Sequence, residues 1–288
     1  HLDYHKTMEN YARAKARLFD LVSAHGTKTG KTAVLNADDA WSKAMRAHAL
    51  CPIISYGVEH DAALMAHDVH LAQDGMELVL VHDGAKLSRL HIGITGLFNV
   101  YNVLAATGAA LAEKVAAADI EAALMDFAGV PGRFELVRAG QDFSVIVDYA
   151  HTPDGMENVL RTARAVTAGR IIAVFGCGGD RDRTKRPIMG RMAAELADIV
   201  VLTSDNPRTE DPAAILDEVE TGVLPVIGDK PYEKLVDRRT AIFHAVQRAQ
   251  KGDTVVILGK GHENYQILKD KTIHFDDRET AREAIRGL

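Results

Sequence analysis

The sequence of 288 residues has only two cysteines and no long apolar run, and these two absences indicate the cellular compartment in which the protein is found. Cys51 and Cys177 cannot form a disulfide framework and lack metal-ligand spacing, which favours a reducing compartment. No apolar stretch approaches the length of about 18 residues that a membrane-spanning helix needs. The N-terminus has neither the basic start nor the apolar segment of a signal peptide. We therefore expect a soluble, cytoplasmic protein without a membrane partner.

An excess of positive charge is absent as well. The chain has 34 Lys and Arg residues against 40 Asp and Glu residues, giving a formal net charge of -6, and the two signs are interspersed. Such a chain offers no basic face to a nucleic-acid backbone, so nucleic acid is not expected as a partner. With 47% hydrophobic residues the chain can bury a sizeable core, and its length suggests two domains.

The first part of the chain mixes short strands and helices. Its periodicity predicts a helix over Met8–Leu21, a strand over Thr32–Asn36, a strand pair over Leu78–His82 and Ser88–Ile94 around the turn Asp83-Gly84, and a helix over Asn99–Ala112. Val130-Pro131-Gly132 then interrupts the pattern, and we place a domain boundary near Pro131.

From Glu135 onward, apolar strands alternate with helices. We expect strands over Ser144–Asp148, Arg170–Phe175, Ile199–Thr203 and Thr254–Leu258, and helices over Asp154–Val166, Met189–Leu196, Pro212–Gly222 and Arg238–Lys251. This alternation predicts an α/β domain with a mostly parallel sheet that is covered on both faces.

Polar clusters follow four of these strands directly. They are Asp148–Asp154, Gly176–Asp182, Asp205–Glu210 and Gly259–Glu263. In a parallel sheet, ligands bind beyond the carboxyl ends of the strands. We therefore predict that the four loops converge on one site.

Two glycine-rich segments resemble nucleotide-binding loops without matching them. Gly26–Thr32 is one residue short of the phosphate-loop spacing and leads into a strand, whereas the working motif opens a helix. Gly176–Arg181 follows a strand but has Arg181 where the dinucleotide fingerprint requires its third glycine. We expect a solvated basic loop in the first case and no dinucleotide cofactor in the second.

An ordered set of motifs covers essentially the whole chain. In order they are HLDYHKTMENYARAKARLF from His1, NADD from Asn36, GLFNVYNVLAA from Gly96, PGRFE from Pro131, VDYAHTPD from Val147, FGCGGDRDRTKRP from Phe175, SDNPRTEDP from Ser204 and GKGHENYQ from Gly259. Together they resemble the Mur ligases, ATP-dependent enzymes of peptidoglycan synthesis. The resemblance is to members that add meso-diaminopimelate to the D-glutamate of UDP-N-acetylmuramoyl-L-alanyl-D-glutamate.

The resemblance implies a domain organisation. Residues 1–131 would be the later part of the central ATP-binding domain, and residues 132–288 a Rossmann-like, mostly parallel C-terminal domain that binds the amino acid. Because the chain begins with His1 rather than methionine, we expect it to be part of a longer protein. In the family, a UDP-sugar domain and a phosphate-binding loop precede this segment, so the chain alone is expected to be an inactive monomer.

The family reaction transfers the γ-phosphoryl group of ATP to a substrate carboxylate, and an incoming amine then attacks the acyl phosphate. Such chemistry depends on charge neutralisation and positioning. By resemblance, His1 would bind Mg²⁺ and Lys15, as a carbamate, would supply an anionic oxygen ligand, so these two are the expected catalytic residues. An ordinary surface lysine is the alternative for Lys15.

Five further residues match nucleotide-binding positions of the family. Asn99 and Asn102 correspond to asparagines that contact adenine, since a carboxamide can both donate to and accept from a purine edge. Helix capping is the alternative for Asn99. Arg133 and Asp148 would contact phosphate or ribose oxygens and ribose hydroxyls, respectively, and His151 could pack on the nucleotide.

The amino-acid pocket is predicted from Asp205-Asn206-Pro207-Arg208, which matches the D-N-P-R sequence of diaminopimelate-adding relatives. The far end of diaminopimelate carries both a carboxylate and an ammonium, so a site that selects it should combine a guanidinium with acids. Arg208 would bind the distal carboxylate. Arg181 would support a carboxylate, and Gly259 and Glu263 would receive the ammonium.

Two kinds of alternative remain at this point. One is another ligase of the same superfamily, either lysine-adding or of the folylpolyglutamate type; the arginine at position 208 argues against it. The other is a non-catalytic module that binds an amino acid or a nucleotide weakly.

Overall fold

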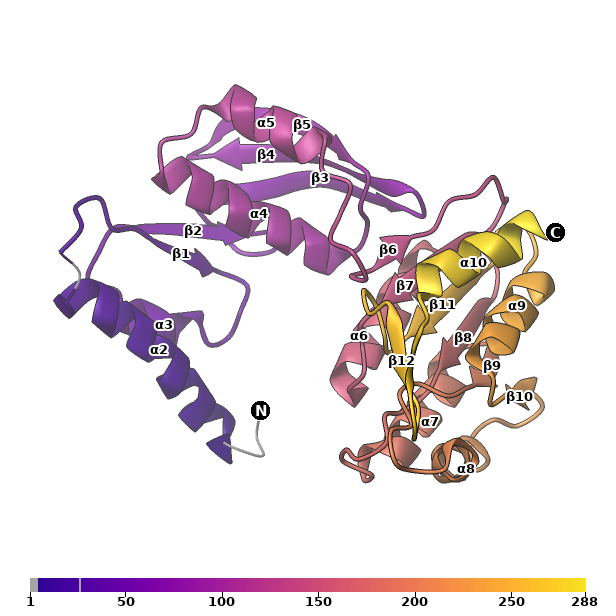
Figure 1. The fold of residues 1–288 in the computed structure, drawn as a ribbon. Coiled ribbons are helices and arrows are strands. Elements are labelled where there is room, and N and C mark those ends of the chain that lie inside the picture. Colours follow the sequence, from indigo (N-terminus) through magenta and orange to yellow (C-terminus); the bar gives the residue numbers. More distant parts are fainter. Residues whose placement is uncertain (1–4, 26) are drawn as a thin grey trace. The chain divides into compact units, whose positions relative to one another are not determined.

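A computed structural model describes residues 5–25 and 27–288 (Figure 1). The chain divides into two compact units, residues 1–128 (unit 1) and 129–288 (unit 2), and each has its own sheet. Within the described ranges, no helix combines the length and the apolar character required to cross a bilayer.

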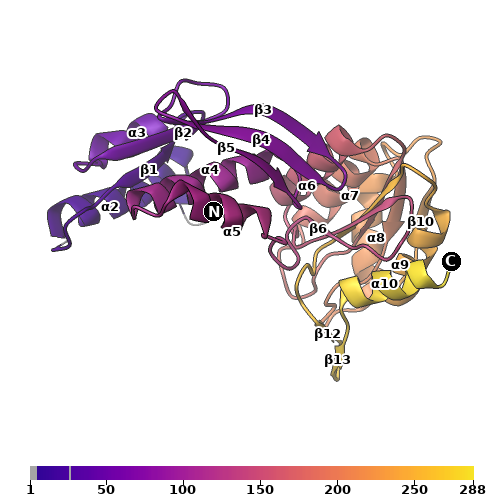
Figure 2. The same cartoon turned by 90° about the horizontal axis from the view of Figure 1, so that it is seen from above.

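Unit 1 contains a five-stranded mixed sheet. Its elements are α2 (Met8–His25), β1 (Ala33–Asn36), α3 (Ser42–His48), β2 (Ile53–Gly57), β3 (Leu64–Ala72), β4 (Gly75–His82), β5 (Ala85–Ile92), α4 (Leu97–Ala112) and α5 (Ala117–Met125). The strands follow one another in chain order, with β1, β2 and β3 parallel and β4 and β5 antiparallel. Helices α4 and α5 lie on the same face of this sheet (Figure 2).

The predicted elements of unit 1 are confirmed: α2, β4 and α4 are longer than predicted, β1 begins one residue later, and β5 begins and ends earlier. The strand pair around Asp83-Gly84 is the hairpin β4–β5, whose two turn residues have φ angles of 49° and 76°. Apolar residues of β3, β4 and β5 alternate toward a core that also includes Val100, Val103 and Leu104 of α4. Strand β3 was not predicted, because its sequence LMAHDVHLA places two histidines and an aspartate among the apolar residues.

Asp38, in the turn after β1, organises the neighbouring loop. Its carboxylate accepts hydrogen bonds from the backbone N–H groups of Val58, Glu59 and His60 at 2.7–3.1 Å, and from the Tyr101 hydroxyl at 2.9 Å. Burial opposes ionisation, but the N–H donors outweigh it and hold the pKa of Asp38 well below its usual range. The charged carboxylate therefore joins β1, the segment after β2, and α4.

Unit 2 is built on a six-stranded sheet in the order β10-β9-β8-β11-β7-β6. Its elements are β6 (Glu135–Leu136), β7 (Ser144–Asp148), α6 (Pro153–Val166), β8 (Ile171–Phe175), α7 (Lys185–Leu196), β9 (Ile199–Leu202), α8 (Pro212–Val223), β10 (Tyr232–Lys234), α9 (Arg238–Arg248), β11 (Thr254–Leu258), β12 (Tyr265–Ile267), β13 (Thr272–His274) and α10 (Asp277–Arg286). Only the edge strand β6 runs antiparallel within this described sheet. The predicted mostly parallel sheet is confirmed.

Helices cover both faces of this sheet, as its continuous apolar strands require. Helices α9 and α10 pack on one face, where their alanine, valine and isoleucine side chains join the inward residues of β7, β8, β9 and β11. Helices α6, α7 and α8 lie on the opposite face (Figure 1). The short hairpin β12–β13 projects from the unit (Figure 2).

The first residue of α9, Arg238, forms a completely buried ion pair with Asp277 of α10. Its Nε and Nη2 atoms donate to the two carboxylate oxygens at 2.8 and 2.7 Å. The same guanidinium donates to the backbone oxygens of Ser204, after β9, and Leu258, at the end of β11. One cation therefore holds two helices and the ends of two strands together.

We expect Arg238→Met to lower the free energy of unfolding by about 3–5 kcal/mol, because it leaves a buried carboxylate and two carbonyls without their donor. Urea unfolding followed by circular dichroism measures this change. The control is Arg191→Met, whose ion pair with Glu195 is exposed and should contribute less than about 1 kcal/mol. Equal losses in the two variants would contradict the role given to Arg238.

We expect Asp38→Asn to destabilise unit 1 by about 1–3 kcal/mol at neutral pH, since it removes the charge that these four donors and the ring of His60 contact. Because the pKa of Asp38 is lower in the folded state than in the unfolded state, its ionised form stabilises the fold above the unfolded pKa of about 4. This stabilisation is lost as the pH falls further, through the pKa of the folded state. The variant should therefore lose less stability on acidification than the wild type.

Trp41 is the sole tryptophan of the sequence, so its fluorescence follows the unfolding of unit 1. Asp39→Asn is the control, because Asp39 is exposed and its carboxylate accepts one backbone hydrogen bond, from Trp41. Identical acid profiles for the wild type and Asp38→Asn would show that the carboxylate has no such effect.

Candidate functional site

The loops after β7, β8, β9 and β11 meet at the carboxyl edge of the unit 2 sheet, as the sequence predicted. Hydrogen bonds join each loop to the next: Gly259 N donates to Asp148 O at 3.1 Å, Gly179 N donates to Asn206 O at 2.9 Å, and Asn206 Nδ2 donates to Glu263 at 2.9 Å. This chain of contacts brings the four polar clusters into one site.

The glycine run after β8 serves this convergence. A Cβ atom on Gly176 would lie 2.0 Å from Thr203 O, and one on Gly179 would lie 1.9 Å from Pro207 O. Both positions therefore require glycine because the loop after β9 approaches their backbone. The structure thus gives a packing reason for a segment that resembles a dinucleotide fingerprint in sequence.

Charged side chains fasten the loop after β8 to the loop after β9. The guanidinium of Arg186 is buried and donates to Glu210 at 2.8 and 2.9 Å and to Glu218 at 2.8 Å. Glu210 also accepts from Asp180 N, and Asp180 in turn accepts from the Thr209 hydroxyl at 2.7 Å. The hydrogen bonds from Arg186 and from the Asp180 backbone lower the pKa of Glu210 to about 2, so it remains an anion.

Arg208 lies between these loops. Its backbone has a φ angle of 52°, and its N–H donates to Ile267 O in β12 at 3.1 Å. Its Nη1 atom donates to Gly179 O at 2.8 Å and to Asn206 O at 3.4 Å. The guanidinium is therefore half-buried against the loop tips.

Asp205 and Gly259 are in close contact. A Cβ atom on Gly259 would lie 2.4 Å from Asp205 Oδ2, and Gly259 has a φ angle of 114°. Burial raises the pKa of Asp205, while the charges of Arg238 and Lys260 act in the opposite direction. Glycine at position 259 thus leaves the space that this buried carboxyl occupies.

Asn206 and Glu263 are linked by a residue that the sequence analysis did not select. Lys260 is completely buried, and its Nζ atom donates to Asn206 Oδ1 at 3.3 Å and to Glu263 Oε2 at 3.1 Å. It also donates to Tyr265 O. A lysine within a charged, glycine-rich loop is normally exposed, so the sequence gives no indication that this side chain is buried.

Arg181, also predicted for the pocket, is exposed. Its Nη1 atom donates to the backbone oxygen of the preceding residue, Asp180, at 3.2 Å. It therefore lies on the exposed surface of the loop after β8.

A second group of predicted residues surrounds Tyr149. The guanidinium carbon of Arg133 lies 4.7 Å from the centre of the tyrosine ring, and the ring of His151 lies 4.8 Å from it. The ring of His262 lies 5.3 Å away on another loop. Tyr149 and His262 were not selected from the sequence, although the predicted residues flank them in the same motifs.

The carboxylate of Asp148 accepts from the backbone N–H groups of Phe134 and Ala150, both at 2.7 Å. Burial raises its pKa, and these bonds and the charge of Arg133 oppose the shift. Asp148 therefore fixes the turn that presents Arg133 and Tyr149.

In unit 1, Asn99 and Asn102 lie one turn apart at the start of α4. Asn99 Nδ2 donates to Thr95 O at 2.9 Å, and Asn99 Oδ1 accepts from Asn102 Nδ2 at 3.0 Å. Asn99 thus donates to the backbone before the helix but does not cap it, because the N-cap residue is Gly96 and no side chain caps this helix start; the helix-capping alternative is wrong. Asn102 is exposed and has its carbonyl oxygen available to a ligand.

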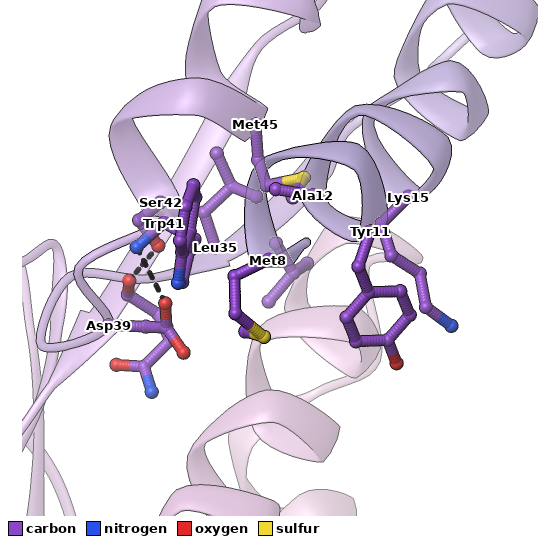
Figure 3. A pocket seen from close by; sticks show the side chains of 11 residues that line it. Met8, Tyr11, Ala12, Lys15, Leu35, Asp39, Trp41, Ser42 and Met45 are labelled. Carbon is purple, nitrogen blue, oxygen red and sulfur yellow. Dashed lines mark hydrogen bonds between the residues drawn. The ribbon is translucent and has the colours of Figure 1, made fainter. Parts of the chain in front are cut away.

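Lys15 lines a cavity of about 300 Å³ between α2, β1 and the segment that contains Trp41 (Figure 3). Its ammonium lies 5.4 Å from the centre of the Tyr11 ring, and Asp39 lies on another wall of the cavity. His1 lies outside the described residues. Among residues 5–25 and 27–288, no group of three His, Cys, Asp or Glu side chains is placed to hold a metal ion.

Comparisons with known proteins agree with the motif order. The Mur ligase middle domain matches residues 1–110, and the Mur ligase glutamate ligase domain matches residues 132–261. A UDP-N-acetylmuramoyl-L-alanyl-D-glutamate--2,6-diaminopimelate ligase from Syntrophomonas wolfei is 48% identical over 287 residues. That alignment covers 100% of this chain and 58% of the relative, so the chain spans little more than half the relative's length.

Two solved structures are similar to the chain. One, a diaminopimelate ligase of the same name, has a TM-score of 0.70 and 38% identity, and the match covers 100% of this chain and 58% of that one. The other is the folylpolyglutamate synthase of Mycobacterium tuberculosis, with a TM-score of 0.69 and 20% identity over 90% of this chain and 58% of that one. The second likeness shows the fold alone.

Proposed function

The chain belongs to the Mur ligase family, and on this basis we propose that it carries the ATP-binding and amino-acid-binding parts of a diaminopimelate-adding ligase of the MurE type. The reaction joins meso-diaminopimelate to the D-glutamate of UDP-N-acetylmuramoyl-L-alanyl-D-glutamate in the cytoplasm. Residues 1–131 would be the later part of the central ATP-binding domain, and residues 132–288 the C-terminal amino-acid-binding domain of a monomeric enzyme.

The observation that carries this proposal is the combination of Arg208 with Asn206 and Glu263 at one sheet edge. A half-buried guanidinium and a carboxylate are held there by neighbouring loops. The far end of diaminopimelate carries one carboxylate and one ammonium, which match these two charges. Lysine has the ammonium without the carboxylate, so it would leave Arg208 unpaired. A site built around a polar partner can reject an analogue that lacks it by roughly 10⁴-fold.

The remaining pocket residues complete this assignment. Gly259 leaves room beside Asp205 and, with Glu263, would face the ammonium. Arg181, exposed on the loop after β8, would approach a carboxylate of the bound amino acid. Each of these contacts positions the amine that attacks the activated carboxylate of the second substrate.

The residues around Tyr149 in unit 2 and, independently, those at the start of α4 in unit 1 carry groups suited to a nucleotide. Arg133 and His151 flank an aromatic ring, and a guanidinium is suited to phosphate or ribose oxygens. Asp148 orders the turn that carries them and would face the ribose, and Asn99 and Asn102 would face the adenine edge. ATP, when bound, supplies the phosphoryl group that activates the substrate carboxylate.

The described residues do not by themselves fit Mg²⁺. This ion takes oxygen ligands, and Lys15 offers a cation unless it is carbamylated. The proposal that His1 and a carbamylated Lys15 hold Mg²⁺ therefore rests on the resemblance of their motif.

In a full-length ligase carrying this sequence, we expect Arg208→Ala to raise the KM for diaminopimelate by roughly 100-fold or more. The KM for ATP should change little, because Arg208 is assigned to the amino acid alone. Arg208→Lys should also be impaired, because a single ammonium cannot form two parallel hydrogen bonds with a carboxylate. Initial rates of phosphate release at varied concentrations of each substrate measure both constants.

Arg161→Ala is the matched control, since Arg161 is exposed on α6 and pairs with Glu157 of the same helix. It should leave both KM values unchanged. Equal increases in the KM for ATP and for diaminopimelate in Arg208→Ala would refute the assignment of Arg208. A wild-type enzyme that prefers L-lysine or a folate substrate to diaminopimelate would refute the proposed function.

A further inference from the structure

Lys260 is a completely buried lysine at the centre of the proposed amino-acid pocket. A buried ammonium is costly unless it is paired and hydrogen-bonded. The proposed reaction assigns it no contact with either substrate. Its burial at this point therefore needs a separate explanation.

The contacts of Lys260 show that it acts on its protein neighbours. An ammonium has three N–H donors, and Lys260 has three acceptors: Asn206 Oδ1, Glu263 Oε2 and Tyr265 O. All three protons are thus directed at the protein. The lysine is accordingly suited to hold other side chains and has no proton left for a ligand.

One consequence is that the Asn206 amide has a fixed orientation. Its oxygen accepts from Lys260 and from Ile267 N at 2.9 Å, so its NH₂ group faces Glu263 Oε2 at 2.9 Å. Glu263 Oε2 then receives two donors, one from Asn206 and one from Lys260. The carboxylate that would face the incoming ammonium is therefore held by Lys260 directly and through Asn206.

Lys260 also contributes to the charge balance of the pocket. Six charged groups meet around Lys260: Arg208, Lys260 and Arg238 are positive, and Asp205, Glu263 and Asp277 are negative. Arg181 is exposed and is not among them. The six charges cancel when all are ionised. Removing Lys260 makes the pocket more negative by one unit, whatever the protonation state of Asp205.

We propose that Lys260 is a positioning residue that sets amino-acid specificity: it holds Glu263 and Asn206 in place, and its charge keeps the pocket suited to a zwitterionic end group rather than to a single ammonium. This inference rests on the proposed function and deepens it. A neutral pocket has no net attraction for a lone cation, whereas the two opposite charges of a zwitterion can each find a partner in it.

The charge argument gives the direction of the effect. Diaminopimelate brings a carboxylate and an ammonium to this end of the pocket, with no net charge, whereas the side chain of lysine brings one positive charge. A pocket that is one unit more negative therefore favours lysine relative to diaminopimelate. A merely structural role for Lys260 would weaken the use of both amino acids without this bias.

The test is the ratio of kcat/KM for diaminopimelate to kcat/KM for lysine in a full-length ligase carrying this sequence. Lys260→Met removes the charge and shortens the unbranched side chain by one atom. We expect the ratio to fall by roughly tenfold or more, because charges a few ångströms apart in a partly buried site interact strongly. The KM for ATP should stay close to that of the wild type.

A second variant, Glu263→Gln, changes the pocket charge in the opposite direction. The same ratio should rise, although the use of both amino acids should become weaker. Lys230→Met is the control: the Lys230 ammonium also donates to three backbone oxygens, those of Ala194, Glu195 and Ala197, but it lies in the segment before β10. It should leave the ratio unchanged.

Opposite shifts in Lys260→Met and Glu263→Gln support the inference. If Lys260→Met fails to fold, as circular dichroism would show, Glu263→Gln alone decides, and an unchanged or lower ratio overturns the inference. An unchanged ratio in a folded Lys260→Met variant overturns it too, while leaving the proposed function intact. A wild-type enzyme without preference for diaminopimelate would overturn both.

Discussion

The unit 2 site depends on the buried guanidinium of Arg238. It is bound on one side by Asp277, and on the other it donates to the backbone oxygens that precede Asp205 and Gly259. A buried charge of this kind is stable only when its partners keep their geometry. The starting points of two site loops are thereby fixed relative to α9 and α10. The tips of the loops then need only short-range contacts to reach their final positions.

Much of this fold could be predicted because strong local patterns dominate it. The four buried parallel strands have continuous apolar runs, and their helices carry apolar residues at helical spacing. Asp211-Pro212 begins α8, and the Asp83-Gly84 turn lies between two apolar strands. The elements that were missed are short or carry mixed polarity, such as the three-residue strands β12 and β13 and the charged helix α10. Their conformation is decided by tertiary contacts that a sequence pattern does not contain.

The sequence could predict where the candidate site lies, but not the hydrogen bonds and ion pairs within it. Polar residues at strand ends indicated Arg208, Asp205 and Glu263, because a parallel sheet brings such ends together. The bonds among them depend on which side chains become buried, and a lysine between two glycines gives no sign of that. Lys260 was missed for this reason, and Arg181 proved to be more exposed than its loop suggested.

The close approach of Gly176 and Gly179 to the loop after β9 has a consequence for the evolution of new specificities on this scaffold. Neither glycine can gain a side chain unless the opposing backbone retreats. The main chains of the loops after β8 and β9 are therefore matched to each other, and transplanting one loop without the other would produce a steric clash. Substrate preference can therefore be changed by exchanging both loops together. It can also be changed by substituting side chains that do not alter the main chain of either loop.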